Sequence, residues 1–384
     1  MKKSFVPAAL ALAVAISIAM AVLKPVPHGH RYDLAVQLTV GLALIGLFIS
    51  APLRLAFDKR VLAAIFIAGL GLAVLNLASI DPEAEIVGAY RSVFETIEAG
   101  GNPYTSGTIF HRGEDGAPVY GNFNYPPAEI YPYYLAYLIA GRWDSTVLTA
   151  AMVLMNGLAV TLLALTFPGL RAASLAAFLP LLLFGEIKTN PSLTFLLTAA
   201  LLALIVRDMR RPGRLAPVLI AVTFGIGLMT KFLVLPLMAA FYWHKVELRR
   251  PASLLPAFGG GGLALLTSAA IMAPFGIAAV LKNTLLFNLV LEDRAALTTF
   301  YPNVLSGPLE ALGLGMVYPI AGAIVVGAAV LAAPRLRLFP ALLAAVFAFL
   351  LAAPTPEPQY LPVVLGLALA FRCWEKESRA EAGS

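Results

Sequence analysis

Long apolar runs separated by short polar stretches dominate the hydrophobic pattern of the chain. A helix needs about 17–25 mostly apolar residues to cross a bilayer, and twelve stretches approach this character. They are residues 5–23, 34–56, 61–79, 145–167, 172–184, 191–206, 215–229, 232–243, 253–273, 303–332, 338–353 and 360–372. Two further pieces, 128–140 and 277–290, are short or amphipathic, which predicts juxtamembrane or re-entrant helices. The pattern therefore predicts an all-α polytopic membrane protein with about twelve transmembrane helices.

Composition supports a lipid environment. The 384 residues are 60% hydrophobic and only 12% charged, whereas a soluble domain carries about 25% charged residues. A chain so poor in charge cannot cover its surface for water, so lipid is the expected solvent for most side chains. Cys373 is the only cysteine, which excludes an intrachain disulfide. The net charge of +6 does not indicate a nucleic-acid partner, because the basic residues lie in short loops.

Basic residues gather in clusters between the apolar runs, and these clusters orient the chain. They are Lys2 with Lys3, Arg54 with Lys59 and Arg60, Arg207–Arg214, Lys245–Arg250, Arg335 with Arg337, and Arg372–Arg379. A single topology places every cluster in the cytoplasm, as the positive-inside rule requires. It predicts a multi-pass protein of the inner or plasma membrane with both termini cytoplasmic.

The same topology predicts one integral domain over residues 1–384. Residues 1–79 form N-terminal spans, 80–127 a large extracytoplasmic loop, 128–372 the remaining spans, and 373–384 a cytoplasmic tail. Lys24–Pro27 is a poor cleavage site, which favours an uncleaved first span over a signal peptide.

The loop 80–127 opens on a cluster of carboxylates, Asp81-Pro82-Glu83-Ala84-Glu85. Asp followed by Pro and Glu is typical of a helix start, and this helix is expected to run to about Ala99 and stop at Gly100–Gly101. Helix capping alone can account for the carboxylates. The alternative is that Asp81 or Glu85, which share a helical face, serves in base catalysis or metal binding.

Aromatic residues follow this helix. Asn102-Pro103-Tyr104 forms a turn with an aromatic anchor, and Tyr125 precedes two prolines that fix its position. The next tyrosines, Tyr131, Tyr133, Tyr134 and Tyr137, are expected to be anchors at the membrane interface.

The order of these features resembles the glycosyltransferase-C superfamily, and more narrowly glycosyltransferase family 87, the polyprenyl-phosphate-mannose-dependent mannosyltransferases and their relatives. Gly185–Asn190 is similar to the Gly-Gln-x-Asn loop of that family, although Glu186-Ile187-Lys188 replaces its central residues. Gly225–Lys231 followed by Pro236 is similar to its lysine-bearing apolar segment, and Gln359–Pro362 to the start of its last span. The resemblance covers roughly residues 80–370.

The resemblance implies a membrane glycosyltransferase that moves mannose, or another hexose or pentose, from a polyprenyl-phosphate donor to a lipid or glycan acceptor on the extracytoplasmic face. It assigns the general base to either Asp81 or Glu85. Donor-phosphate binding falls to Lys231, Lys188 and Arg294. Substrate contacts fall to Asn102, Tyr104, Tyr125, Glu186, Asn190 and Gln359. Some members of the superfamily need a divalent cation, such as Mg or Mn, at the acid.

Lys231 is the strongest cation candidate, because a lysine within an apolar stretch costs about 2.5–3.5 kcal/mol unless it is paired or reaches water. The alternative is a lysine that snorkels to the membrane interface. Two other functions stay open for the whole chain. One is a lipid or sugar transporter or flippase, although no internal symmetry is visible. The other is a non-catalytic membrane protein of polysaccharide assembly.

Overall fold

The computed structural model of the protein describes residues 85–112, 117–143, 145–167, 192–246, 251–286 and 317–352, together with residues 309, 312, 313, 363 and 367. Within this part the chain is mostly helical, as the sequence predicts. The predicted spans 5–23, 34–56, 61–79 and 172–184, and most of 360–372, lie outside the described residues.

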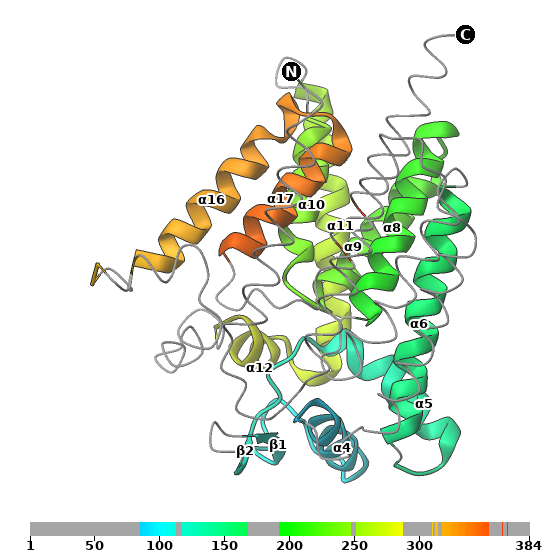
Figure 1. Ribbon diagram of the computed structural model, residues 1–384, viewed down its shortest axis with the longest axis vertical. Helices are drawn as coiled ribbons and strands as arrows, with labels where there is room; N and C mark the ends of the chain where they lie inside the picture. Colours follow the sequence, from blue (N-terminus) through cyan, green and yellow to red (C-terminus); the bar gives the residue numbers. More distant parts are fainter. Residues whose placement is uncertain are drawn as a thin grey trace, which may run out of the picture.

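Among the described residues, seven helices form the main bundle, which Figure 1 shows. They are α6 (Ser145–Thr166), α8 (Ser192–Arg210), α9 (Leu215–Leu228), α10 (Val234–His244), α11 (Leu254–Met272), α16 (Tyr318–Ala332) and α17 (Leu338–Ala352). The bounds of these helices confirm that the corresponding apolar stretches are helical. α16 begins at Tyr318, within the stretch predicted over 303–332. Pro319 stands in the first turn of α16, where a missing backbone N–H costs no helical hydrogen bond.

Two described helices are long and apolar enough to cross a membrane, Ser192–Arg210 and the run Leu254–Phe275 that includes α11. The exposed face of α11 is strongly apolar, with Leu255 and Phe258 both more than 70% exposed. Large apolar side chains in such a position are typical of contact with lipid or another apolar partner. Twelve spans stay a prediction.

One end of the bundle gathers basic residues. The C-terminal end of α10 meets the turn between α16 and α17, where the His244 ring Nδ1 lies 2.9 Å from the carbonyl oxygen of Ala333. Lys245 Nζ lies 3.8 Å from a carboxylate oxygen of Asp208 near the end of α8. The clusters at 207–214, 245 and 335–337, which are far apart in sequence, therefore lie at one end of the bundle.

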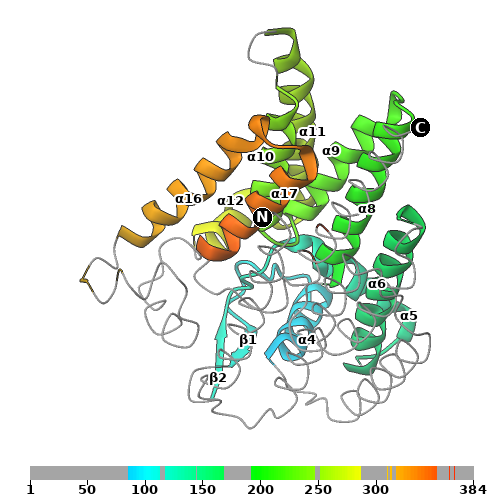
Figure 2. The same cartoon turned by 45° about the horizontal axis from the view of Figure 1, so that its top comes forward.

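The opposite end carries the polar and aromatic segments (Figures 1 and 2). These are α4 (Glu85–Glu98), the hairpin of β1 (Ile109–Arg112) and β2 (Pro118–Gly121), the short 3-10 helix η1 (Pro127–Glu129), α5 (Ile130–Ala140), and α12 (Ile277–Leu281) with the π-helical turn η5 (Lys282–Leu286). The predicted stop of α4 is confirmed, because Gly100 has a φ of +74° and its N–H binds the Ile97 carbonyl.

The hairpin was not predicted from the sequence. Its strands pair antiparallel with Ile109 opposite Gly121 and Phe110 opposite Tyr120. An isolated two-stranded hairpin is barely stable, so it needs a packing partner. That partner is α4, because Ile109 is fully buried and the Phe110 ring lies against Gly88.

Two apolar cores stabilise the fold. The larger core runs along the bundle through α6, α8, α9, α10 and α17, and the second lies under α4, η1 and α5 at the polar end. Leu196 of α8 packs against both cores. The polar end is therefore continuous with the bundle.

Close packing of α9 on α11 depends on Gly225. A Cβ at this position would overlap the carbonyl oxygen of Ala264 and lie 2.6 Å from Thr267 Cβ. Ser268 adds a hydrogen bond of 3.0 Å from its hydroxyl to the Gly225 carbonyl. The crossing fixes the end of α9 that leads into Lys231.

We expect Gly225→Ala to lower the free energy of unfolding by about 1–3 kcal/mol, the usual cost of overpacking. Gly262→Ala in α11 is the matched control, because nothing lies within 4 Å of a Cβ at that position. Because alanine favours a helix more than glycine does, this control is expected to raise the free energy of unfolding by up to about 1 kcal/mol. Thermal unfolding in detergent measures both variants, and equal melting temperatures for them would contradict the close packing.

Candidate functional site

Lys231 lies in a break between two helices. α9 ends at Leu228 and α10 begins at Val234, and the turn between them is stabilised by the Lys231 N–H, which binds the Gly227 carbonyl at 3.2 Å. Pro236 stands in the first turn of α10, where its missing N–H costs nothing. The break falls in the gap between the predicted stretches 215–229 and 232–243.

Thr230 ties the break to the start of α8. Its hydroxyl donates to the Gly227 carbonyl at 2.6 Å and accepts a hydrogen bond from the Thr194 hydroxyl at 2.9 Å. These bonds satisfy polar groups that the end of α9 leaves open. All atoms of Thr194 and Thr230 are buried, so the break is a fixed part of the structure.

The Lys231 ammonium is held inside the protein. The residue is only 8% exposed, and Nζ lies over the Tyr125 ring at 4.7 Å from its centroid, within the range of a cation–π interaction. The backbone joins the same two segments, because the Ala128 N–H binds the Met229 carbonyl at 2.9 Å. The low exposure and the packing on Tyr125 favour a lysine with a protein partner over one that extends into water.

Glu129 is the carboxylate of this cluster. It ends η1, is completely buried, and accepts a hydrogen bond of 3.1 Å from the Tyr90 hydroxyl of α4. Lys231 acts on the same carboxyl electrostatically. α4 thus supplies a hydroxyl to the Glu129 carboxyl, and the Lys231 ammonium packs on Tyr125, four residues before Glu129.

Burial raises the pKa of the Glu129 carboxyl to about 8, although the Lys231 charge and the Tyr90 hydrogen bond both act to lower it. Removing an ionised carboxylate from water is costly, so the neutral form is favoured where burial is complete. Burial, followed by the nearby Glu129, also raises the pKa of the Tyr90 hydroxyl well above its usual 10. Both shifts favour the protonated forms of Glu129 and Tyr90.

Aromatic rings enclose the charged groups. The Tyr90 ring meets Tyr133 at 5.0 Å and Phe123 at 5.7 Å between centroids, both edge-on. Tyr104 lies edge-on to Phe123 at 5.6 Å, and its hydroxyl donates to the Tyr125 carbonyl at 2.7 Å. Rings packed around these polar groups exclude water and lower the local dielectric constant, which strengthens electrostatic interactions inside the cluster.

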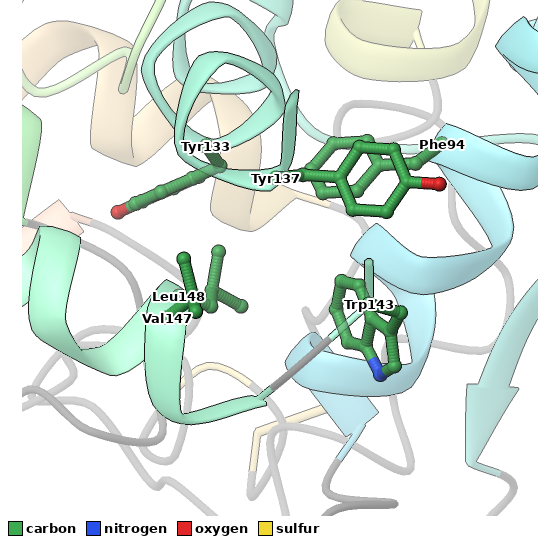
Figure 3. Close-up of a pocket in the computed structure, with 6 residues that line it drawn as sticks. All are labelled: Phe94, Tyr133, Tyr137, Trp143, Val147 and Leu148. Carbon is green, nitrogen blue, oxygen red and sulfur yellow. The ribbon is translucent and has the colours of Figure 1, made fainter. Parts of the chain in front are cut away.

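A small aromatic pocket lies next to this cluster (Figure 3). Its walls come from α4, α5, the turn after α5 and the first turn of α6. The lining residues are Phe94, Tyr133, Tyr137, Trp143, Val147 and Leu148. Tyr133 is fully buried, which contradicts its prediction as an anchor at the membrane interface. It packs against Tyr90 because α4 covers the face of α5 on which it lies.

Two asparagines hold the aromatic loop on the bundle. Asn102 accepts a hydrogen bond of 3.0 Å from the Tyr104 N–H and donates one of 2.7 Å to the Phe275 carbonyl, just after α11. Asn283 in η5 donates to the Tyr104 carbonyl at 2.8 Å. Asn102 therefore has an observed structural role, and its predicted contact with a substrate stays untested.

We expect Asn102→Ala to lower the free energy of unfolding by about 1–3 kcal/mol, because it removes two hydrogen bonds and leaves their partners without them. Asn102→Asp keeps the acceptor for the Tyr104 N–H and should lose less. Thermal unfolding in detergent measures both variants. If the alanine variant is as stable as wild type, the clamp between the loop and α11 contributes nothing.

The structure brings part of the predicted site together. Lys231, Tyr125 and Tyr104 share the cluster, and Asn102 supports it. Glu85 is the first residue of α4, and only its backbone is described. The other predicted residues lie outside the described part of the chain, and they are Asp81, Glu186, Lys188, Asn190, Arg294 and Gln359.

Glu129 and Tyr90 were missed by the sequence reasoning. A usable signal for Glu129 was present, because an isolated acid directly before the apolar run 130–140 is costly to bury and implies a partner. Tyr90 sits in the middle of an amphipathic helix among Val87, Val93 and Phe94, so its position predicted only a core residue.

A divalent cation, which the family resemblance allows, finds no ligand set in the described residues. No group of three His, Cys, Asp or Glu residues there could hold a metal ion. The described cluster supplies a single carboxyl close to a lysine, which does not fit a cation site. We therefore assign no step to a metal.

Comparisons with protein-family models, with curated proteins and with solved structures gave no match to this chain. The resemblance carried by the short motifs stays a prediction, and the geometry of the cluster is the basis for the function proposed below.

Proposed function

We propose that the chain is a membrane glycosyltransferase that moves a sugar from a polyprenyl-phosphate donor to a lipid or glycan acceptor. The observation that carries the proposal is the position of Lys231, buried at a helix break against Tyr125 of the polar segment. A cation held at the end of an apolar bundle suits a ligand with a phosphate head and a long apolar tail.

The separation of charge along the bundle supports the location of the site. The clusters around Arg207–Arg214 and Lys245 lie at one end, and Lys231 with Glu129 at the other. If the basic end faces the cytoplasm, as the positive-inside rule predicts, the cluster faces outward. A multi-pass protein of the cell membrane with about twelve spans follows as part of this proposal.

The reaction needs a cation for the leaving phosphate. During transfer, the bond from the sugar to the phosphate oxygen breaks and its electron pair stays with the lipid phosphate. A new bond joins the sugar to the acceptor oxygen, whose proton passes to a carboxylate base. Lys231 would stabilise the negative charge on the phosphate.

Asp81 or Glu85 is the proposed base, and the fold supports such a role for this segment. Tyr90 hydrogen-bonds Glu129, and Glu85 precedes Tyr90 by five residues on α4. At a rise of about 1.5 Å per residue, the Glu85 backbone lies about 7.5 Å along the helix axis from Tyr90. α4 therefore begins at the same end of the bundle as the cluster (Figure 1), and the choice of Asp81 or Glu85 as base rests on the resemblance.

Sugar transfer in isolated membranes tests the proposal. Membranes that contain the chain are incubated with radiolabelled polyprenyl-phosphate mannose, and with nucleotide-linked mannose as the control for the donor class. We expect incorporation of label into lipid or glycan from the lipid donor alone. Transfer from the nucleotide sugar without transfer from the lipid donor would contradict the proposal.

A further inference from the structure

The basic end of the bundle is built where the ends of α8 and α10 meet the turn between α16 and α17 (Figure 1). The contact of Lys245 with Asp208 joins α10 to α8, and the contact of His244 with Ala333 joins α10 to that turn. Among the described residues, Asp208 is the one acidic residue at this end. The exposed basic residues there are Arg207, Arg210, Arg211, Arg214, Lys245, Arg335 and Arg337.

Helix stability does not explain two of these arginines. Arg214 is the N-cap of α9 and makes no capping hydrogen bond with its side chain, and Arg337 directly precedes α17, where its carbonyl accepts the Ala341 N–H at 2.9 Å. A helix N-terminus carries a partial positive charge, so a basic residue there is unfavourable for the helix alone. An anion at either helix start would be attracted both by the arginine and by backbone N–H groups that the helix leaves open.

Large apolar side chains are exposed directly beside the arginines. Leu336 stands between Arg335 and Arg337 and is 39% exposed, and Leu215 follows Arg214 and is 64% exposed. A soluble anion would leave these leucines in water. Basic side chains beside exposed apolar ones are typical of the boundary between lipid headgroups and acyl chains. The ligand that matches both kinds of side chain is a lipid with an anionic headgroup.

We propose that the basic end of the bundle binds the anionic headgroups of phospholipids in the leaflet around it. The guanidinium groups of Arg214, Arg335 and Arg337 contact the phosphates, for which their planar, forked geometry is suited. Leu215 and Leu336 lie against the upper part of the acyl chains. Sugar transfer at Lys231 is a separate property, because Lys231 lies at the opposite end of the bundle.

Thermal unfolding of the purified full-length chain in dodecyl maltoside micelles tests this headgroup binding. A ligand that binds only the folded protein raises its melting temperature. We expect the melting temperature to rise with the mole fraction of phosphatidylglycerol and to stay unchanged with the same mole fraction of phosphatidylcholine. Because the contacts join exposed charges, the rise should shrink between about 0.05 M and about 0.5 M NaCl.

A double variant locates the binding surface. Arg335→Gln/Arg337→Gln should weaken the apparent affinity for phosphatidylglycerol by about 25-fold, at about fivefold for each charge removed near an anionic surface. Both side chains are exposed, so the variant should keep the fold. Arg91→Gln/Lys282→Gln is the matched control, because it removes two exposed basic side chains at the polar end. This control should keep the wild-type response.

Equal rises with phosphatidylglycerol and phosphatidylcholine would overturn the proposal, because the headgroup charge would then have no effect. A rise of the same size with inorganic phosphate or with polyglutamate would also overturn it, in favour of a soluble anion or an acidic protein partner. Equal loss of the response in the two double variants would contradict the location. If Arg335→Gln/Arg337→Gln does not fold, a wild-type response that salt leaves unchanged would contradict headgroup binding. None of these results bears on sugar transfer, which is measured separately in membranes.

Discussion

Replacing Lys231 with glutamine is expected to reduce sugar transfer by about 100-fold or more, which is the usual cost of losing one group that stabilises a developing negative charge. Glutamine keeps most of the side-chain length and removes the charge. The effect should be large because Lys231 is buried, where a charge-assisted contact with phosphate is stronger than in water.

Lys245 provides a matched control for this experiment. Its Nζ also lies over an aromatic ring, Phe241 at 4.5 Å, but at the basic end of the bundle. Lys245→Gln should therefore keep transfer close to wild type. Transfer from radiolabelled polyprenyl-phosphate mannose measures both variants, and similar activity in both would remove Lys231 from the mechanism.

Stability is expected to fall with rising pH because of Glu129. The folded protein keeps the Glu129 proton up to about pH 8, whereas the unfolded chain loses it near pH 4.5. The raised pKa therefore favours folding fully below pH 4.5, and this contribution is lost as pH rises through 8. At about 1.4 kcal/mol per pH unit, the loss over the whole window is on the order of 5 kcal/mol.

Glu129→Gln imitates the protonated carboxyl and should remove this dependence. We expect the melting temperature of the variant, relative to wild type, to increase steadily from pH 5 to pH 8. Tryptophan fluorescence during heating in detergent measures the difference, and Glu98→Gln should follow wild type. If the curves for wild type and Glu129→Gln stay parallel across this range, Glu129 titrates as an exposed carboxyl does.

The helices could be predicted because their signals are local. Apolar runs gave the bounds of α6 and α17 closely, and Gly100 marked the end of α4 through its left-handed backbone. The gap between the apolar stretches 215–229 and 232–243 located the break between α9 and α10. Each of these signals depends on residues within a few positions of one another.

The site could be predicted only in part, because its contacts join distant segments. Tyr90 and Glu129 are 39 positions apart, and Asn102 and Phe275 are 173 apart. The sequence identified Lys231 by its isolation, and Tyr125 by the two prolines after it. It favoured Asp81 and Glu85 over Glu129, because the helix-start pattern drew attention to the carboxylates that precede α4.

The proposed function requires the cluster around Lys231 and the basic end of the bundle to face opposite sides of the membrane. Labelling with a membrane-impermeant reagent measures this arrangement most directly. Single cysteines are placed at exposed Thr105, near the cluster, and at exposed Arg214, at the basic end, in a Cys373→Ser background. Sealed right-side-out vesicles are then treated with a membrane-impermeant maleimide. The account predicts that Thr105→Cys reacts in intact vesicles and that Arg214→Cys reacts only after permeabilisation. Labelling of both positions in intact vesicles, or of Arg214→Cys alone, would contradict it.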